Sequence, residues 1–315
     1  LEVGFLNNRY SLELDYYNKR TKDLLLNRPI PGTAGETRLE NVGEIENKGF
    51  EFTINSLNID KPDFTWSTNL TISANKNKVI SIGDGQEFIT LDNPNGSSGP
   101  SIRIIPGYPA PAYLGATYLG TYRTTAEIDA DGVVGSVLGG PRYVDLDGNG
   151  AINQLDFIVH GDPNPDFYGG LRNTLTYKDF TLDFFFHGSY GNEILNAAYH
   201  LGYFGRDPRS NLLPIVKDRW TTSNQNSDIP RAGSSFGNYQ QRSDVSYQDG
   251  SFLRLKNVTL TYDLDIPGMK RASVYVTGNN LLLFTKFTHG DPEQSNYGDG
   301  LAQGVANGGY PYNSS

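Results

Sequence analysis

The stretch Phe180-Thr-Leu-Asp-Phe-Phe-Phe-His-Gly-Ser-Tyr190 changes character at almost every position. Successive side chains of a β-strand point to opposite faces, so this segment would have one apolar face and one polar face. The apolar residues are Phe180, Leu182, Phe184 and Phe186, and the polar ones are Thr181, Asp183 and His187. The strands of a soluble sheet can show the same alternation. Whether the sheet is soluble or spans a membrane must therefore be judged from how the pattern recurs along the chain.

The same alternation recurs in segments that are joined by very short turns and very long loops in turn. Several segments keep a period of two over nine or more residues, about the length that a transmembrane strand needs. This arrangement is typical of an antiparallel transmembrane β-barrel, with lipid outside and water inside. We therefore predict an all-β fold of this kind with long extracellular loops. The expected strands are residues 3–6, 9–17, 50–55, 64–73, 171–177, 180–190, 253–264 and 272–287, and the long loops are about 27–47, 83–165 and 192–249.

Some stretches have no clear period. Residues 83–165 are rich in Gly and Pro, and they fit either one large folded loop or a loop interrupted by two more strands. Leu212 to Trp220 could form a short helix, and we expect no strand in the tail from Thr288. The last expected strand would run outward, so an inward strand is expected after Ser315. Because the chain opens at Leu1 without Met or a leader, we interpret it as part of a longer protein.

The bulk composition restricts the possible classes of protein. The mean hydropathy of −0.47 does not exclude a barrel, because only alternate strand residues touch lipid. No apolar run of the length of a transmembrane helix occurs. The absence of Cys excludes a disulfide scaffold and a thiolate metal site. The net charge of −9 argues against nucleic acid as a partner, since phosphate binding needs clustered Lys and Arg.

Six motifs follow one another along almost the whole chain. They are residues 16–25 (YYNKRTKDLL), 41–51 (NVGEIENKGFE), 145–150 (DLDGNG) followed by 162–166 (DPNPD), 249–257 (DGSFLRLKN), 279–281 (NNL) and 291–293 (DPE). In this order they make the chain resemble the SusC/RagA family of TonB-dependent outer-membrane transporters from Bacteroidetes-type bacteria. The resemblance implies that residues 1–315 are the C-terminal part of a barrel of about 22 strands. No segment resembles the plug domain, the TonB-binding box or the last strand of that family.

The family resemblance also implies a function and partners. The complete protein would import oligosaccharides, or less often peptides, across the outer membrane of a Gram-negative bacterium. A SusD-like surface lipoprotein would cap the barrel and capture the substrate, and TonB would act on the plug through the missing N-terminal part. The strands would form the wall against membrane lipid, and the long loops would form the lid and the docking surface for the lipoprotein.

Residues 145–156 have the spacing of a calcium loop within one of the expected outer loops. Oxygen ligands at positions one, three, five, seven, nine and twelve, with Gly at six for the sharp turn, can surround a hard cation. The predicted ligands are Asp145, Asp147, Asn149, the carbonyl of Ala151, Asn153 (through water) and Asp156. We predict a structural Ca²⁺ here, and no catalytic role for it.

Two observations qualify the calcium prediction. Position twelve is Asp156, where EF-hands have a bidentate Glu, so weaker binding and a closer analogy to dockerin-like loops are expected. Asp and Asn also stabilise turns through local hydrogen bonds, and an Asx-rich turn needs no ion.

Other polar and aromatic side chains admit a functional and a structural interpretation. The four histidines show no pair at metal-ligand spacing, and His187 would face the lumen as a solvated residue. Glu13, Asp15 and Asp183 would be polar lumen residues. The aromatic residues of the expected loops could stack on sugar rings, but they also fit the aromatic girdles of a barrel. They are Tyr108, Tyr113, Tyr118, Tyr122, Tyr199, Tyr203 and Trp220.

No Ser-His-Asp arrangement, nucleotide loop or paired acid–base motif stands out, so we predict that the protein is not an enzyme. Two alternatives remain open besides the importer. One is a soluble or surface-attached carbohydrate-binding β-protein that uses residues 145–156 as a dockerin-like element. The other is a passive, porin-like channel. Substrate-binding residues are not identified by the sequence.

Overall fold

The computed structural model describes residues 1–29, 37–91, 101–196, 212–232, 243–288, 290–293 and 305–306. Strands dominate this part of the chain, and it holds one α-helix, α1 (Thr125–Asp131). Within the same residues, no helix is both long enough and apolar enough to span a bilayer.

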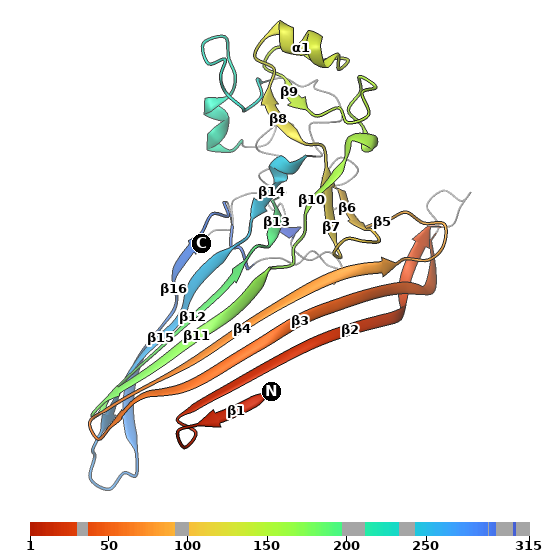
Figure 1. The fold of residues 1–315 in the computed structure, drawn as a ribbon. Helices are drawn as coiled ribbons and strands as arrows, with labels where there is room; N and C mark the ends of the chain where they lie inside the picture. Colours follow the sequence, from red (N-terminus) through yellow and green to blue (C-terminus); the bar gives the residue numbers. More distant parts are fainter. Residues whose placement is uncertain are drawn as a thin grey trace.

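Eight strands form one antiparallel sheet in the order β1-β2-β3-β4-β11-β12-β15-β16. Figure 1 shows it as a single curved layer, with the short turns at one end and the long connections at the other. The strands are β1 (Glu2–Phe5), β2 (Tyr10–Pro29), β3 (Thr37–Lys61), β4 (Phe64–Ser81), β11 (Phe167–Tyr177), β12 (Phe180–Tyr190), β15 (Phe252–Leu264) and β16 (Ala272–Thr285).

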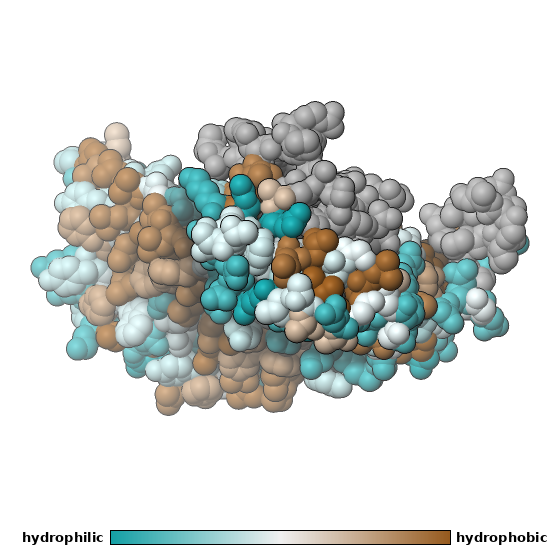
Figure 2. Space-filling view, turned by 90° about the horizontal axis from the view of Figure 1, so that it is seen from above, coloured by the Kyte–Doolittle hydropathy of each residue, from teal (hydrophilic) through white to brown (hydrophobic). Residues whose placement is uncertain are grey.

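The register of the sheet aligns apolar residues from strand to strand on one face. One row runs across all eight strands without a polar residue: Val3, Leu12, Ile54, Leu70, Leu171, Phe186, Leu255 and Leu282. Many side chains of this face are exposed, including Val276 at 66% and Phe180 at 48%. In the view from above, hydrophobic surface gathers at the left and lower margins of the molecule (Figure 2).

The opposite face of the sheet is polar and its side chains bond across the strands. Asp183 accepts hydrogen bonds from Arg172 Nε and Thr174 Oγ1, both at 2.8 Å. Asn69 donates to Asn55 at 2.7 Å. A sheet with one polar, cross-linked face and one exposed apolar face differs from a compact sandwich, in which the apolar faces are buried against each other.

Aromatic residues border the apolar face at both ends of the strands. Phe180 packs on Tyr262 near the short turns, with ring centroids 4.6 Å apart. Phe167 stacks on Tyr190 near the long connections, at 5.1 Å. Two such rims are the positions at which membrane barrels carry aromatic girdles.

Two of the strands are much longer than the sequence predicts. The loop expected at about 27–47 is wrong in most of its length, because β2 continues to Pro29 and β3 begins at Thr37. The added strand pairs carry charges on exposed surface, such as Arg20 with Glu44. In these extensions Leu26 and Ile45 pack in a hydrophobic cluster with Val79, and the register shifts between Thr21 and Leu25. The period of two that reveals a half-buried strand is therefore interrupted.

The described part of the stretch 83–165 (residues 83–91 and 101–165) is a folded excursion that adds no strand to the eight-stranded sheet, because β4 pairs directly with β11. It contains two small sheets, one ordered β10-β7-β6-β5 and one made of β8 and β9, and the helix α1 (Figure 1). The strands are β5 (Ile89–Thr90), β6 (Ser101–Ile104), β7 (Ala112–Gly115), β8 (Tyr118–Thr121), β9 (Pro141–Tyr143) and β10 (Ile158–Gly161).

The second excursion pairs with the tail. β13 (Glu193–Asn196) lies between β14 (Tyr247–Asp249) and β17 (Val305–Ala306). The expectation of a tail without a strand is therefore wrong, although a two-residue strand is too short to carry a period. The helix expected at 212–220 is a short 3₁₀ segment, Pro214–Asp218.

The hydrophobic core lies in these excursions and beside the upper part of β4. One cluster combines Ile102, Tyr113 and Leu195, all fully buried. Tyr113 also stacks on Tyr247, with ring centroids 5.0 Å apart. Residues far apart in the chain thus form one packed unit, which we call the outer loop unit (residues 82–91, 101–166, 192–196, 212–232 and 243–250).

Candidate functional site

The loop at residues 145–156 follows β9 and is closed by its own hydrogen bonds. Asp145 accepts from the backbone N–H of Gly148 at 2.9 Å and of Gly150 at 2.8 Å. Both glycines have positive φ, 69° and 78°, which favours glycine over any residue with a side chain. The backbone N–H groups hold the pKa of the Asp145 carboxyl below its ordinary value.

Asp156 closes the other end of the loop. Its side chain is fully buried and accepts from Leu146 N at 2.8 Å and from Asn153 N at 2.7 Å. Carboxylate oxygens of Asp145, Asp147 and Asp156 lie within 4.8 Å of one another. Three carboxylates at this distance repel each other unless a proton or a cation compensates their charge.

The remaining predicted ligands take part in the same loop. Asn149 Oδ1 accepts from Ala151 N at 2.8 Å, and the Ala151 carbonyl accepts from Asn153 Nδ2 at 3.0 Å. Asn153 Oδ1 accepts from Leu155 N at 2.8 Å. All the predicted ligand atoms are oxygens on one tight loop. Ca²⁺ prefers oxygen ligands, so the residues present fit this ion.

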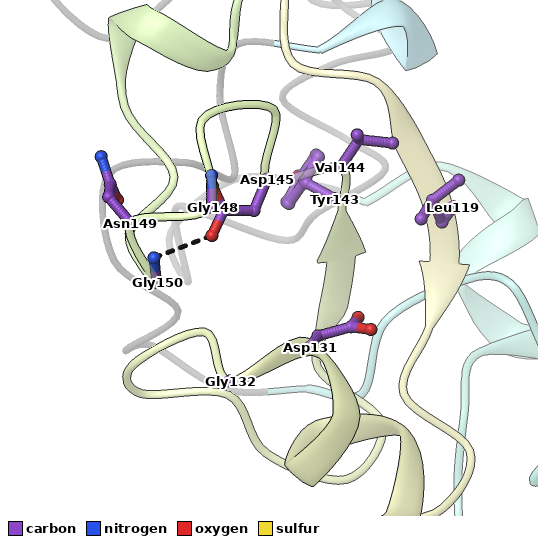
Figure 3. A pocket seen from close by; sticks show the side chains of 9 residues that line it. All are labelled: Leu119, Asp131, Gly132, Tyr143, Val144, Asp145, Gly148, Asn149 and Gly150. Carbon is purple, nitrogen blue, oxygen red and sulfur yellow. Dashed lines mark hydrogen bonds between the residues drawn. The ribbon is translucent and has the colours of Figure 1, made fainter.

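A cavity of about 530 Å³ adjoins this loop. Figure 3 shows its lining, with Asp145, Gly148, Asn149 and Gly150 from the loop and with Tyr143, Val144 and Leu119 beside them. Asp131, at the end of α1, completes the lining and bonds Arg142 through both carboxylate oxygens, at 2.7 and 3.0 Å. The guanidinium holds the pKa of Asp131 below its ordinary value, so this wall of the cavity carries paired charges.

A second polar cluster lies on the polar face of the sheet, where the chain after β16 folds back over β12 and β15. Arg254 is almost fully buried and lies 2.5 Å from Asp291 and 2.7 Å from Glu293. Lys256, at a bulge in β15, bonds both oxygens of Glu293 at 3.1 Å. His187 Nδ1 lies 3.6 Å from the same carboxylate.

The sequence placed His187 on the polar face but did not reveal this cluster. Apart from His187, the residues come from the motifs at 249–257 and 291–293, which are separated in the chain, and no periodic pattern links them. The charges within those two motifs were the signal that could have found it. The cluster ties the segment 290–293 to the sheet.

The other predicted residues fall into three groups. Glu13 and Asp15 lie on the polar face of β2, opposite Thr53 and Glu51 of β3. His160 is in β10, and its Nε2 lies 3.0 Å from the carbonyl of Gly115. His200, His289, Tyr199 and Tyr203 lie outside the described residues.

Of the five predicted loop aromatics that the structure describes, three are core residues of the outer loop unit. Tyr113, Tyr122 and Trp220 are buried, so their faces are not open to a sugar ring. They are not girdle residues either, because they lie in the excursions rather than at the ends of the long strands. Tyr108 is exposed and Tyr118 is half-buried.

Glu193, at the start of β13, has an unusual environment that the sequence did not indicate. Burial, together with the nearby charges of Asp162 and Asp249, raises its pKa from 4.5 to about 7. The backbone N–H of Glu193 donates to the Asp162 carbonyl at 3.0 Å. Three carboxyl groups therefore meet at the junction between the outer loop unit and the sheet.

The comparisons with known proteins agree with the architecture. The chain is 40% identical over 322 residues to the TonB-dependent receptor P26 of Formosa agariphila, a match that covers 99% of this chain and 32% of the relative. It is 27% identical over 306 residues to the TonB-dependent receptor SusC of Bacteroides thetaiotaomicron, with 93% and 29% covered. The chain thus spans about a third of the length of these relatives. No protein-family model matches it.

Solved structures share the fold. The structure of the RagAB peptide transporter matches with a TM-score of 0.77 at 23% identity, over 97% of this chain and 32% of that one. The RagAB peptide importer in its "open-open" state matches with a TM-score of 0.76. The predicted fold is confirmed: the eight-stranded sheet is a fragment of a barrel wall. The relatives are named as receptors and transporters, which agrees with the prediction of no enzyme.

Proposed function

Because the chain is a homologue of TonB-dependent receptors of the SusC/RagA type and forms part of their barrel, we propose that the complete protein imports nutrients across the outer membrane. The observation that carries the proposal is the apolar row that crosses the whole sheet from Val3 to Leu282. A bilayer covers such a face without a second protein layer, and the polar face is then left to a watery lumen.

The two regions of the chain would divide the work of uptake. The sheet forms the wall of the lumen, where cross-strand polar side chains such as Asp183 and Arg172 are available to water and solutes. The outer loop unit sits at the end of the long connections, which is the extracellular side of such barrels. It would present substrate to the lumen and dock a SusD-like lipoprotein, while TonB acts through a part of the protein beyond this chain.

The substrate class that we propose is an oligosaccharide or a peptide too large for passive diffusion. The RagAB structure is named as that of a peptide transporter, which supports a peptide as one candidate. The described residues of the lumen face carry hydroxyl, amide and charged groups in cross-strand pairs, which can exchange hydrogen bonds with either solute.

Uptake measurements in the native host test the importer. A strain without the complete gene should fail to accumulate labelled oligosaccharide or peptide, and the wild-type gene should restore uptake. Loss of TonB should abolish the restored uptake, because opening requires energy from the inner membrane. Uptake that survives the loss of TonB would instead indicate a passive channel.

A second measurement separates the importer from a soluble carbohydrate-binding protein. The full-length protein should fractionate with the outer membrane, need detergent for extraction and run differently on gels before and after heating. A SusD-like lipoprotein should co-purify with it. Purification in plain buffer with sugar binding would overturn the proposal.

For residues 145–156 we propose a structural Ca²⁺ that stiffens the outer loop unit. The convergence of the Asp145, Asp147 and Asp156 carboxylates supports it, since a divalent cation would neutralise their mutual repulsion. The cation would be held by the loop oxygens, and no chemistry of the substrate is assigned to it.

Limited proteolysis of the purified full-length receptor tests the calcium proposal. Chelation should increase cleavage within 145–156 several-fold, and added Ca²⁺ should reverse the increase. The double variant Asp145→Asn with Asp156→Asn keeps oxygen acceptors for the backbone but removes two charges, so cleavage should be high with or without Ca²⁺. Asp129→Asn, on the exposed surface of α1, is the matched control and should behave like wild type. Cleavage that ignores the chelator would contradict a bound ion.

A further inference from the structure

One aromatic side chain breaks the division of the sheet into an apolar face and a polar face. In the run Phe184-Phe185-Phe186 the first and third rings belong to the apolar face, so strand alternation places Phe185 on the polar face. Phe185 is aligned with Arg172 of β11 and with Asn257 of β15, and it is partly exposed. It therefore adds apolar surface to a face that otherwise carries amides, hydroxyls and charges.

The position of the Phe185 ring is set by Gly170 of the neighbouring strand. A Cβ atom at Gly170 would lie 2.6 Å from Cε2 and 2.8 Å from Cζ of the ring. The ring therefore occupies the space that the absent side chain of Gly170 leaves, and it lies along the sheet instead of standing out from it. A side chain at position 170 would displace the ring.

Two more rings continue from Phe185 toward the long connections. His187 follows on the same face of β12, with ring centroids 6.5 Å apart, and Phe252 of β15 is next, 5.2 Å from His187. Glu293 lies 3.6 Å from His187 Nδ1, so the segment 290–293 borders them on one side. We call Phe185, His187 and Phe252 the aromatic column. Three partly exposed rings in contact, rimmed by polar groups, form the kind of surface that marks a ligand-binding groove.

A polar hollow of about 280 Å³ lies on the polar face near the inner end of the aromatic column. Arg172, which is aligned with Phe185, lines it together with Asn69 of β4. Asn69 is oriented by its hydrogen bond to Asn55 at 2.7 Å, and Arg172 by donating Nε to Asp183 at 2.8 Å. These bonds leave the terminal nitrogens of Arg172 and the side-chain oxygen of Asn69 for other partners.

We propose that the aromatic column and the polar hollow bind successive sugar units of an oligosaccharide. The proposal rests on the proposed function, because the polar face meets solutes only if it lines a lumen. The C–H bonds of a sugar ring pack on the negative face of an aromatic ring, and its hydroxyls exchange hydrogen bonds with amides and guanidinium groups. The site offers both kinds of contact side by side. A peptide, whose side chains vary, has no apolar face that recurs at every unit.

Uptake by the native host tests the site. The probes are two labelled pools of the same size range, oligosaccharides cut from the polysaccharides on which the host grows and tryptic peptides of casein. A strain without the gene receives the wild-type or a variant gene. Phe185→Leu keeps an apolar side chain but loses the flat ring, so the oligosaccharide concentration for half-maximal uptake should rise about fivefold. Phe185→Tyr keeps the ring and should stay near wild type.

Phe184→Leu is the matched control, because Phe184 is the preceding residue on the opposite, apolar face, and it should not change uptake. Asn69→Ala should raise the half-maximal concentration about threefold, the effect of one lost hydrogen bond. The amount of each variant in the outer membrane is measured as well. If Phe185→Leu failed to insert, Phe252→Leu at the outer end of the aromatic column should show the same rise.

The same half-maximal concentration for wild type, Phe185→Leu and Phe184→Leu would overturn the sugar site, as would uptake of the peptide pool alone. Leakage of a large antibiotic through the Phe185→Leu receptor, with an unchanged half-maximal concentration, would also overturn it, because the ring would then seal against another part of the complete protein. If the wild-type gene restored no uptake of either pool, the proposed function itself would be refuted.

Discussion

The sheet and the outer loop unit of this chain place their apolar side chains in opposite ways. On the sheet, side chains such as Val276 and Phe284 are mostly exposed, whereas Tyr113 and Leu195 in the outer loop unit are fully buried. Apolar side chains are therefore exposed on one face of the sheet and buried in the outer loop unit. The difference indicates which solvent each region meets, because apolar surface is stable against acyl chains but must be hidden from water.

The two regions also depend on different forces. In the sheet, backbone hydrogen bonds and polar cross-strand pairs join the strands, because lipid gives no hydrophobic gain for packing apolar side chains together. In the outer loop unit, short strands of two to four residues contribute few hydrogen bonds, and the buried clusters hold distant segments together. Removing a large apolar side chain should therefore destabilise the outer loop unit more than the sheet.

The largest effect is expected for Tyr113→Ala. The ring fills the core of the outer loop unit against Tyr247, so its removal should cost about 3–5 kcal/mol there. Hydrogen exchange of the full-length receptor should show lost protection in β6, β7 and β13. The control Leu282→Ala removes an exposed side chain from the apolar face and should change little. Similar effects of both substitutions would remove the contrast between the regions.

A charge on the sheet should come next. Val258→Arg places a cation at mid-strand on the apolar face, beside Phe184, and should destabilise the barrel by about 2–4 kcal/mol. Thr261→Arg puts the same residue on the polar face of the same strand, where water solvates it, and should be nearly neutral. Urea unfolding of the receptor in lipid vesicles would measure both. If Thr261→Arg proved the more harmful, the assignment of the two faces would be reversed.

The smallest effect concerns pH at the junction of the two regions. The pKa of Glu193 is about 7 in the folded protein and 4.5 ordinarily, so the unfolded form loses its proton first as pH rises. The outer loop unit should therefore lose stability between about pH 4.5 and 7 and remain constant above that range. Glu193→Gln should flatten this dependence. Protease resistance near β13 across the pH range would measure it, and an unchanged slope in the variant would show that another group titrates.

The sequence predicted the sheet where each strand has lipid on one side and water on the other. The hairpins on either side of Lys178-Asp179 and Lys61-Pro62-Asp63 are at the expected places, because the period of two and the turn residues agree. The extensions of β2 and β3 escaped prediction because charged residues lie among apolar ones such as Leu26 and Ile45, and because register shifts between Thr21 and Leu25 interrupt the alternation.

The outer loop unit could not be predicted in the same way. Its strands are too short to show a period. They pair with segments that are distant in sequence, as Ile194 does with Gln248 and Leu195 with Val305. The spacing of residues 145–156 did predict that Asp145, Asp147 and Asp156 lie close together, because a tight loop leaves few other arrangements. The cluster of Arg254 with Glu293 was missed, since nothing local links a strand residue to a segment 39 positions later.

Because the strands differ in length, the edge of the sheet at the long connections is uneven in height. β2 and β3 have 20 and 25 residues, whereas β11 and β12 have 11 each. At about 3.3 Å per residue, a surplus of some ten residues raises one side by about 30 Å, roughly the depth of a bilayer's hydrocarbon interior. The edge of the wall is therefore formed by long strands at one side, and by short strands that lead into folded loops at the other.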